Sequence, residues 1–263
     1  MLENKVAIVT GASSGIGYAT SLALSKAGVR VAVGARRIDK LQELEKQIIK
    51  NNGGDIFVQK LDVTTKSDCD SFADAVVRKW GKVDILINNA GLMPLSYFVN
   101  RKVEEWERMI DVNIKGVLYC TSAVIPHMLD KKSGHIVNIS SVAGRIVFAG
   151  GSVYCATKHA ITAFSEGLRK ELSPQYNIRV TCIEPGAVST ELLETITDES
   201  MEGHIQATKN METLQSEDIA KAVLYAICNT STESCECQRD IDKAHSPGKV
   251  ITNSPLSEKG KIN

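Results

Sequence analysis

Tyr154 and Lys158 lie four residues apart, and a phenol beside an ammonium group is suited to proton transfer. A free tyrosine has a pKa near ~10, which is too high for a base at neutral pH. A cation on the same helix face stabilises the phenolate and lowers that pKa. Of the six tyrosines, only Tyr154 has a lysine four residues later. The pair predicts acid–base chemistry at a carbonyl or alcohol oxygen; the plainer interpretation is an i,i+4 packing pair.

Ser140 and Ser141 end a β-branched run that begins at His135. A hydroxyl at the carboxyl end of a parallel strand can polarise a substrate carbonyl. Because neighbouring side chains on a strand point to opposite faces, only one of the two serines can face such a site. The other is expected to pack or cap. The alternative is that both serines are structural.

Residues 10–17 join a short hydrophobic run to an amphipathic stretch, and their glycines suit a phosphate-binding turn. Gly11 permits a tight turn, Gly15 lets the backbone approach a pyrophosphate, and Gly17 lets the helix pack close to the sheet. The start of the helix adds free N–H groups and a positive dipole end. This context favours a dinucleotide site over an ordinary strand–helix turn. The predicted contacts are Gly11, Ser13, Ser14, Gly15, Ile16 and Gly17.

Ala35, Arg36 and Arg37 follow the second hydrophobic run, where a chain preferring NAD carries an acidic residue for the ribose 2′-hydroxyl. Ala35 lacks that carboxylate, and Arg36 offers a guanidinium for a 2′-phosphate. Asp39 is acidic but lies inside the start of the next helix. The alternative is that Arg36 and Arg37 only begin that helix on a solvated face. The sequence therefore favours NADP(H), with both arginines as cofactor-binding residues.

Short β-branched runs alternate with longer amphipathic segments along most of the chain. The predicted strands are 5–10, 29–34, 55–61, 83–88, 135–140 and 178–183, and the helical segments include 16–27, 40–50, 66–80, 106–129 and 154–172. Such alternation predicts an α/β fold: one domain with a doubly wound parallel sheet and helices on both faces. Residues 190–214 lack a strong period and are expected to form a flap beside the site.

Four motifs appear in a fixed order: residues 10–17, Asn88-Asn89-Ala90-Gly91, Tyr154 with Lys158, and Pro185-Gly186. With them, residues 3–227 resemble the short-chain dehydrogenase/reductase family. The resemblance implies a Rossmann-like fold and an enzyme that transfers hydride between NADP(H) and a small alcohol or carbonyl compound.

The resemblance also implies a catalytic set of Asn113, Ser141, Tyr154 and Lys158. The family's serine precedes the tyrosine by thirteen positions, which selects Ser141 over Ser140. The resemblance further implies that Lys158, besides stabilising the phenolate, hydrogen-bonds to the nicotinamide ribose. Asn113 is expected to open a helix kink and bind, through its backbone, a water that leads to Lys158. The plainer interpretation is an exposed or helix-disturbing asparagine.

Further cofactor contacts come from three loops by the same resemblance. The loop after the third strand matches the adenine contact, residues 88–91 brace the central strand and the cofactor ribose, and the loop after the sixth strand bonds the nicotinamide carboxamide. Generic loops or a Pro-Gly turn are the alternatives. The predicted residues are Asp62, Val63, Asn89, Ala90, Gly91, Pro185, Gly186, Val188 and Thr190, in addition to Tyr154 and Lys158.

Composition limits the class of partner. The chain has 31 Lys and Arg against 31 Asp and Glu, so the usual electrostatic case for nucleic acid or a membrane surface is absent. No apolar run approaches the roughly 18 residues of a membrane span. Seven cysteines, without a secretion signal, predict reduced thiols in a cytoplasmic protein. The histidines and Cys235-Glu236-Cys237 lack metal-ligand spacing, so no metal is expected.

The expected function is therefore an NADP(H)-dependent oxidoreductase acting on a small aldehyde, ketone or hydroxy acid, with Tyr154 as the acid/base. Two alternatives are a non-catalytic NADPH-binding regulator and an isomerase or dehydratase that uses the dinucleotide transiently. The full catalytic set weighs against a regulator, because a sensor needs none of it. The sequence leaves the substrate and the reaction direction open. The family resemblance implies a homodimer or homotetramer.

Residues 228–263 differ from residues 1–227, which are expected to form the catalytic domain. Only 9 of these 36 residues are hydrophobic and none is aromatic, a composition poorly suited to a packed element. The family usually has a seventh strand here, often resembling N-E-I-L-I-R-P. Permitted codons for residues 235–250, read one base later, can encode V-N-V-K-E-I-L-I-R-P-T-A-Q-E-R and a stop.

We therefore interpret residues 228–263 as the product of a single-base frameshift near Cys228; the alternative is a genuine divergent tail. An in-frame gene without the slip would contradict the hypothesis. A frameshift would remove an edge strand and leave backbone groups unpaired, which puts the expected oligomer in doubt. The catalytic residues all lie upstream.

Overall fold

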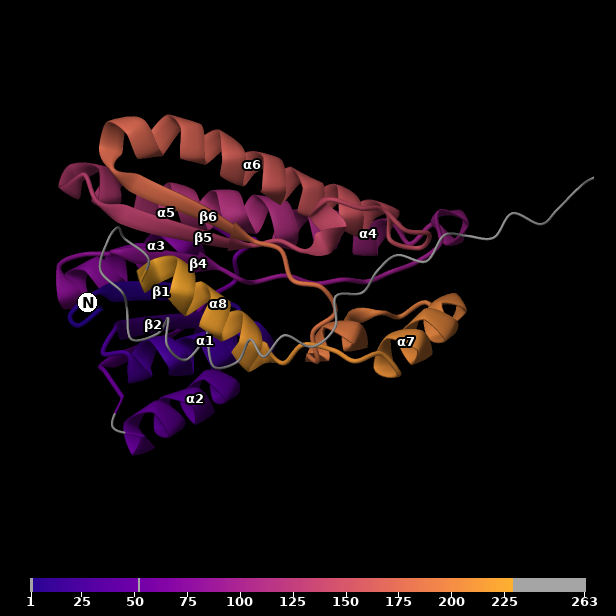
Figure 1. Cartoon of the computed structure of the whole chain (residues 1–263), viewed down its shortest axis with the longest axis horizontal. Helices are drawn as coiled ribbons and strands as arrows, with labels where there is room; N and C mark the ends of the chain where they lie inside the picture. Colours follow the sequence, from indigo (N-terminus) through magenta and orange to yellow (C-terminus); the bar gives the residue numbers. More distant parts are fainter. Residues whose placement is uncertain (1, 52, 229–263) are drawn as a thin grey trace, which may run out of the picture.

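A six-stranded parallel sheet organises the computed structural model, which describes residues 2–51 and 53–228 (Figure 1). The strand order is β3-β2-β1-β4-β5-β6. The strands are β1 (Val6–Thr10), β2 (Arg30–Ala35), β3 (Ile56–Lys60), β4 (Ile85–Asn88), β5 (Gly134–Ile139) and β6 (Ile178–Ile183). Each predicted strand is found, and the predicted doubly wound parallel sheet is confirmed.

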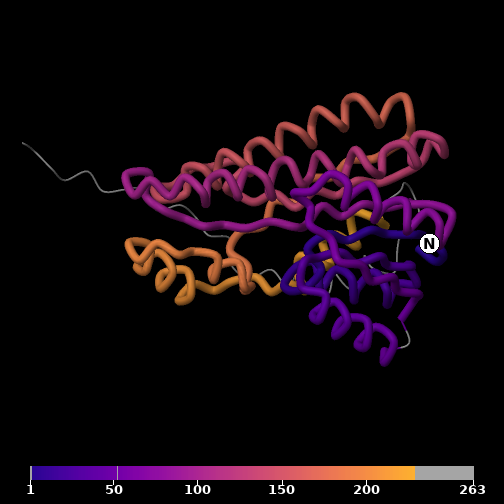
Figure 2. Tube along the Cα trace, turned by 180° about the vertical axis from the view of Figure 1, so that it is seen from behind, coloured from indigo at the N-terminus to yellow at the C-terminus, as the bar shows by residue number. Residues whose placement is uncertain are grey.

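Helices cover both faces of the sheet, as Figures 1 and 2 show from opposite sides. One face carries α1 (Gly15–Lys26), α2 (Ile38–Lys50) and α8 (Ser216–Cys228). The other carries α3 (Lys66–Trp80), α5 (Gly116–Lys131) and α6 (Ser152–Tyr176). Parallel strands need cover on both sides because their side chains alternate between two buried faces.

Strand β1 shows this alternation directly. Val6 and Ile8 belong to the core beneath α3 and α5, whereas Ala7 and Val9 belong to the core beneath α1, α2 and α8. All four side chains are almost completely buried. A continuous hydrophobic run without polar alternation is therefore what a central strand of this sheet requires.

The segment predicted as one helix over residues 106–129 is interrupted. Helix α4 (Val103–Ile110) passes into a π-helical turn at Asp111–Lys115 before α5 begins at Gly116. The backbone at Gly116 lies against Val63, where an added Cβ would be 2.7 Å from Val63 Cγ2. The turn lies where the family resemblance implied a helix kink at Asn113, although the hydrophobic period alone does not register one extra residue in a turn.

Two cysteines meet inside the core between α3 and α5. The Sγ atoms of Cys69 and Cys120 lie 3.5 Å apart, and both side chains are buried. Cys69, Cys120, Cys155 and Cys182 form no disulfide in the part of the chain that the structure describes.

Arg179 ties the end of α8 to the sheet. Its guanidinium donates to the carbonyls of Ala226 and Ile227, at 3.2 and 3.0 Å. Nη2 of Arg179 also lies 3.0 Å from Nδ1 of His135, whose Nε2 is 2.8 Å from Thr181 Oγ1. Burial and the neighbouring guanidinium lower the pKa of His135 to about 3, so its ring is neutral and accepts from Arg179 through Nδ1.

Helix α8 ends at Cys228, the residue at which the tail was expected to begin. Residues 229–263, which carry the frameshift hypothesis, lie outside the described residues.

The predicted flap consists of short helical turns that lie to one side of the sheet (Figure 1). They are 3-10 turns at Glu191–Thr195 and Glu199–Met201, followed by α7 (Glu202–Lys209). The flap starts and ends close together, because Val188 and Leu214 form an isolated parallel bridge. No helix within residues 2–51 and 53–228 is long and apolar enough to cross a membrane.

Helix α8 can be tested as part of the core. Val223 is fully buried against α1, so Val223→Ala should lower the free energy of unfolding by about 2 kcal/mol through lost burial and a cavity. Lys221→Ala, an exposed position in the same helix, is the control and should change stability little. Urea unfolding measures both. Equal effects would contradict a packed α8.

Candidate active site

The predicted site residues gather at the carboxyl ends of the strands. Strand order reverses between β1 and β4, and loops that leave in opposite directions at such a point open a crevice. The residues described below come from the connections that follow all six strands, from the π-helical turn before α5 and from the start of α6.

Residues 10–17, called the phosphate loop after their predicted role, have the geometry that their glycines predict. Gly11 has a φ of +65°, a conformation that side chains other than glycine rarely adopt. A Cβ on Gly17 would lie 2.4 Å from Asn89 Nδ2 and 2.5 Å from the Gly11 carbonyl oxygen. Helix α1 starts at Gly15, so its first N–H groups face this loop. The close approach of helix and loop is therefore confirmed.

Hydrogen bonds from the loop after β4 hold the phosphate loop in place. Asn89 Nδ2 donates to the carbonyls of Thr10 and Gly11 at 3.0 and 3.1 Å. The backbone N–H groups of Asn89 and Ala90 both donate to Thr10 Oγ1, at 3.0 and 3.1 Å. Thr10 therefore positions the loop after β4, although it is not among the predicted site residues. Its place at the end of a buried strand is the signal that could have identified it.

Arg37, more than Arg36, reaches the phosphate loop. Its guanidinium donates to the hydroxyls of Ser13 and Ser14, with the shortest contact at 2.7 Å. Nη2 of Arg37 also lies 2.8 Å from a carboxylate oxygen of Glu191, in the flap. Arg36 is exposed, and its positive charge instead helps to lower the pKa of the Asp62 carboxylate.

Asp62 and Val63 follow β3 as expected. Asp62 Oδ1 accepts hydrogen bonds from the backbone and hydroxyl of Thr64, at 3.0 and 2.7 Å. Burial raises the pKa of Asp62, but these bonds and the nearby Arg36 outweigh it, so the net pKa lies below its usual value. Val63 is buried against Gly116.

Tyr154 lies in the first turn of α6 and is buried. Burial raises its pKa to about 12, and hydrogen bonding with Ser141 opposes this shift. The phenol is therefore protonated at neutral pH. A protonated phenol beside a serine hydroxyl is able to donate to a carbonyl oxygen.

Lys158 points to the same side of α6, with Nζ 5.8 Å from the centre of the Tyr154 ring. Its Nζ donates to the carbonyl of Ile139, at the end of β5, at 3.0 Å. Burial lowers the pKa of Lys158 from 10.5 to about 8. The ammonium is thus still mostly charged at neutral pH and lies where it can stabilise a Tyr154 phenolate.

Asn113 occupies the π-helical turn and is buried. Its side chain accepts from the Leu92 N–H at 2.9 Å and donates to the Leu92 carbonyl at 2.9 Å and to Thr157 Oγ1 at 3.1 Å. Thr157 in turn donates to the Tyr154 carbonyl at 2.7 Å. The side chain therefore joins the loop after β4 to α6, a role that the sequence did not indicate.

Ser140 and Ser141 take different roles, as expected from strand alternation. Ser140 is buried and donates to the Lys158 carbonyl at 3.0 Å, which fixes β5 against α6. Ser141 is half-buried and accepts from the Ala143 N–H at 3.1 Å. Ser140 thus packs against α6, as the sequence analysis expected of one of the two serines.

The loop after β6 lies against the other site loops. The Pro185 carbonyl accepts from Ser141 Oγ at 3.4 Å and from the Val142 N–H at 2.9 Å. The side chain of Thr190 lies beside the phosphate loop, where a Cβ on Gly15 would be 3.1 Å from Thr190 Cγ2. Gly186 has open space around its Cα, because an added Cβ would meet nothing within 4 Å.

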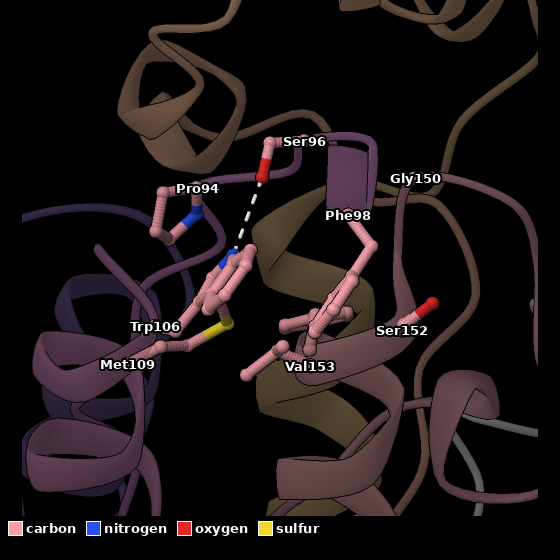
Figure 3. Close-up of a pocket in the computed structure, with 9 residues that line it drawn as sticks. Pro94, Ser96, Phe98, Trp106, Met109, Gly150, Ser152 and Val153 are labelled. Carbon is pink, nitrogen blue, oxygen red and sulfur yellow. Dashed lines mark hydrogen bonds between the residues drawn. The ribbon is translucent and has the colours of Figure 1, made fainter. Parts of the chain in front are cut away.

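A small aromatic-lined pocket adjoins Tyr154 (Figure 3). Phe98 stacks on Trp106 with ring centres 4.6 Å apart, and Trp106 Nε1 donates to Ser96 Oγ at 3.4 Å. The other lining residues are Pro94, Met109, Gly150, Ser152 and Val153. None of these residues is among the predicted catalytic or cofactor-binding residues, since a pocket formed by α4, the start of α6 and the loops before them leaves no local pattern.

Comparison with known proteins identifies the family. A family model described as short chain dehydrogenase matches residues 5–201. An uncharacterized oxidoreductase of Staphylococcus saprophyticus is 45% identical over 228 residues, covering 86% of this chain and 91% of the relative.

Solved structures agree. The closed form of a serine dehydrogenase complexed with NADP+ has a TM-score of 0.78 and 36% identity, over 85% of this chain and 89% of that one. A 3-ketoacyl-(acyl-carrier-protein) reductase from Brucella melitensis complexed with NADH has a TM-score of 0.77 and 29% identity, over 88% and 93% of the two chains.

The Rossmann-like sheet and the relatives named above define the class of protein. The protein is an oxidoreductase. The chain belongs to the short-chain dehydrogenase family, and the resemblance noted from its motifs is confirmed.

The close packing at Gly17 can be tested with a matched glycine. Gly17→Ala should lower the free energy of unfolding by about 1–3 kcal/mol, because the new methyl overlaps Asn89 and the Gly11 carbonyl. Gly167→Ala in α6 meets nothing within 4 Å and should raise stability by about 0.5–1 kcal/mol. Thermal unfolding of both variants gives the comparison. A harmless Gly17→Ala would contradict the described contact.

At neutral pH, burial of the charged Lys158 ammonium lowers the free energy of unfolding of the protein. A pKa lowered to about 8 corresponds to about 3 kcal/mol, so Lys158→Met should raise the melting temperature at pH 7 by several degrees. Between pH 8 and 10 the folded wild type loses this proton before the unfolded chain does, so wild-type stability should rise relative to the variant. A constant difference across this range would be the contrary result.

Proposed function

We propose that the enzyme is an NADP(H)-dependent oxidoreductase that transfers hydride between the nicotinamide and a small alcohol or carbonyl compound. The observation that carries the proposal is the arrangement of Tyr154, Lys158 and Ser141, with the Lys158 ammonium 5.8 Å from the Tyr154 ring. This arrangement provides a proton donor, a cation and an orienting hydroxyl at the carboxyl edge of the sheet.

The phosphate loop fits a dinucleotide. Glycines remove the side chains that would fill the space beside the start of α1, and the helix N-terminus favours phosphate. Arg37, Ser13 and Ser14 together form a donor set suited to a 2′-phosphate. When bound, the nicotinamide cofactor supplies or accepts the hydride. Solved relatives are complexed with NADP+ in one case and with NADH in another, so the NADP(H) preference rests on this donor set.

Tyr154 would act as the acid in the reducing direction. Its raised pKa keeps the proton available at neutral pH, and the substrate oxygen would become basic enough to take that proton as hydride adds to the carbonyl carbon. Lys158 would stabilise the phenolate that remains, and Ser141 would hold the carbonyl oxygen. Asn113 would support proton resupply through the backbone of its π-helical turn, since its side chain is already bonded to Leu92 and Thr157.

The proposed substrates are small aldehydes, ketones and hydroxy acids. The serine dehydrogenase at 36% identity favours including a 3-hydroxy acid such as serine.

We also propose a cytoplasmic homodimer or homotetramer whose catalytic domain is residues 1–227. Its residues 228–263 would arise from the frameshift, which the sequence of the coding DNA tests.

Replacing Tyr154 tests the mechanism. Tyr154→Phe removes the proton donor while keeping the ring, so turnover should fall by at least about 100-fold, as expected for the loss of acid–base catalysis. NADPH binding, followed by nicotinamide fluorescence, should persist.

Following NADPH absorbance with a panel of aldehydes, ketones and hydroxy acids separates the alternatives. Net oxidation of NADPH supports the proposal, and conversion without net oxidation indicates an isomerase or dehydratase. Binding without any conversion indicates a regulator. Undiminished turnover in Tyr154→Phe would overturn the assigned role, and Tyr225→Phe, on α8, serves as the control.

A further inference from the structure

Glu191 places a carboxylate where the cofactor-binding groups of the phosphate loop meet. Its Oε2 lies 2.8 Å from Nη2 of Arg37, a distance typical of a charge-assisted hydrogen bond. The same Nη2 donates to Ser13 Oγ at 3.1 Å and to Ser14 Oγ at 2.7 Å. One guanidinium nitrogen with two hydrogens therefore has three acceptors, and one of them is an anion.

The position of Glu191 in the fold makes this contact specific. It is the first residue of the 3-10 turn that begins the flap, whereas Arg37 lies between β2 and α2, directly before α2. The two residues are 154 positions apart, so the ion pair joins the connection between β2 and α2 to the flap after β6. Thr190, immediately before Glu191, lies against Gly15 and fixes the start of this turn beside the phosphate loop.

The charge at this point opposes a second anion. Hydrogen bonds from Arg37 and Ser14 lower the pKa of Glu191, which keeps it ionised at neutral pH. A 2′-phosphate that binds Arg37, Ser13 and Ser14 would bring its own negative charge to the same donors. Two anions then compete for one cation, and like charges at short range destabilise each other.

We propose that Glu191 is a specificity-determining residue that competes with the cofactor 2′-phosphate for Arg37 and thereby narrows the preference for NADPH over NADH. This inference rests on the proposed function, because it assumes that a nicotinamide dinucleotide binds at the phosphate loop. NADH has a hydroxyl in place of the 2′-phosphate, so it does not compete for Arg37.

The size of the effect follows from exposure. The side chains of Arg37 and Glu191 are 46% and 45% exposed, so water and salt screen the pair. Exposed pairs of this kind change an equilibrium by about 3- to 5-fold. The expected effect is therefore a moderate change in cofactor ratio and not a complete switch.

The test compares dissociation constants of NADPH and NADH, measured by nicotinamide fluorescence at low salt. In Glu191→Gln the ratio of the NADH constant to the NADPH constant should rise about 3- to 5-fold. Using the ratio cancels any effect on the pyrophosphate that both cofactors share. Glu194→Gln, an exposed carboxylate of the same 3-10 turn, is the matched control and should leave the ratio unchanged.

A double variant assigns the effect to Arg37. In an Arg37→Met background, Glu191→Gln should no longer change the ratio, because the competition needs the guanidinium. An unchanged ratio in the single variant overturns the inference. So does weaker NADPH binding, which would mean that Glu191 holds Arg37 in its binding position. A wild-type protein that binds neither dinucleotide would overturn the proposed function itself.

Discussion

The buried ammonium group of Lys158 constrains how the neighbouring strand, helix and loop pack around it. A buried charge is destabilising unless polar groups surround it, and here the Ile139 carbonyl accepts from Nζ at the end of β5. Ser140 bonds the Lys158 carbonyl and holds that strand end against α6. The loop after β4 then passes close by, with a Cβ on Gly91 placed 3.9 Å from Nζ. The cation therefore requires β5, α6 and this loop to meet at one point.

A second set of hydrogen bonds connects this point to the phosphate loop. Asn113 joins Leu92 to Thr157, and three residues earlier in the same loop Asn89 bonds the carbonyls of Thr10 and Gly11. The short loop after β4 thus contacts the acid–base pair with one part and the turn after β1 with another. The relative position of the two parts of the site is consequently determined by hydrogen bonds of two short side chains, those of Asn89 and Asn113, most of them to main-chain groups.

Local patterns predicted much of this arrangement. Hydrophobic runs located the strands, glycine spacing located the turn at Gly11, and the i,i+4 spacing located Tyr154 with Lys158. The kink at Asn113 was expected only from the family resemblance, and features that depend on distant segments were missed: the side-chain bonds of Asn113 and the stacked Phe98 and Trp106. Arg36 was expected to lead at the 2′-phosphate, whereas Arg37 is the residue that contacts Ser14. Which of two adjacent side chains turns toward a loop depends on tertiary contacts that spacing does not contain.

The placement of α8 affects the order in which the chain can fold. The core beneath α1 and α2 includes Val223 and Ile227, whereas the core beneath α3 and α5 draws its residues from positions up to Val180. During synthesis from the N-terminus, the face covered by α3, α5 and α6 can form its core while the face covered by α1 and α2 still lacks α8. The apolar surface of α1, made early, stays open until α8 emerges, and such long-range contacts form slowly. Nascent chains of this protein should therefore depend on chaperones most strongly in the interval between completion of β6 and completion of α8.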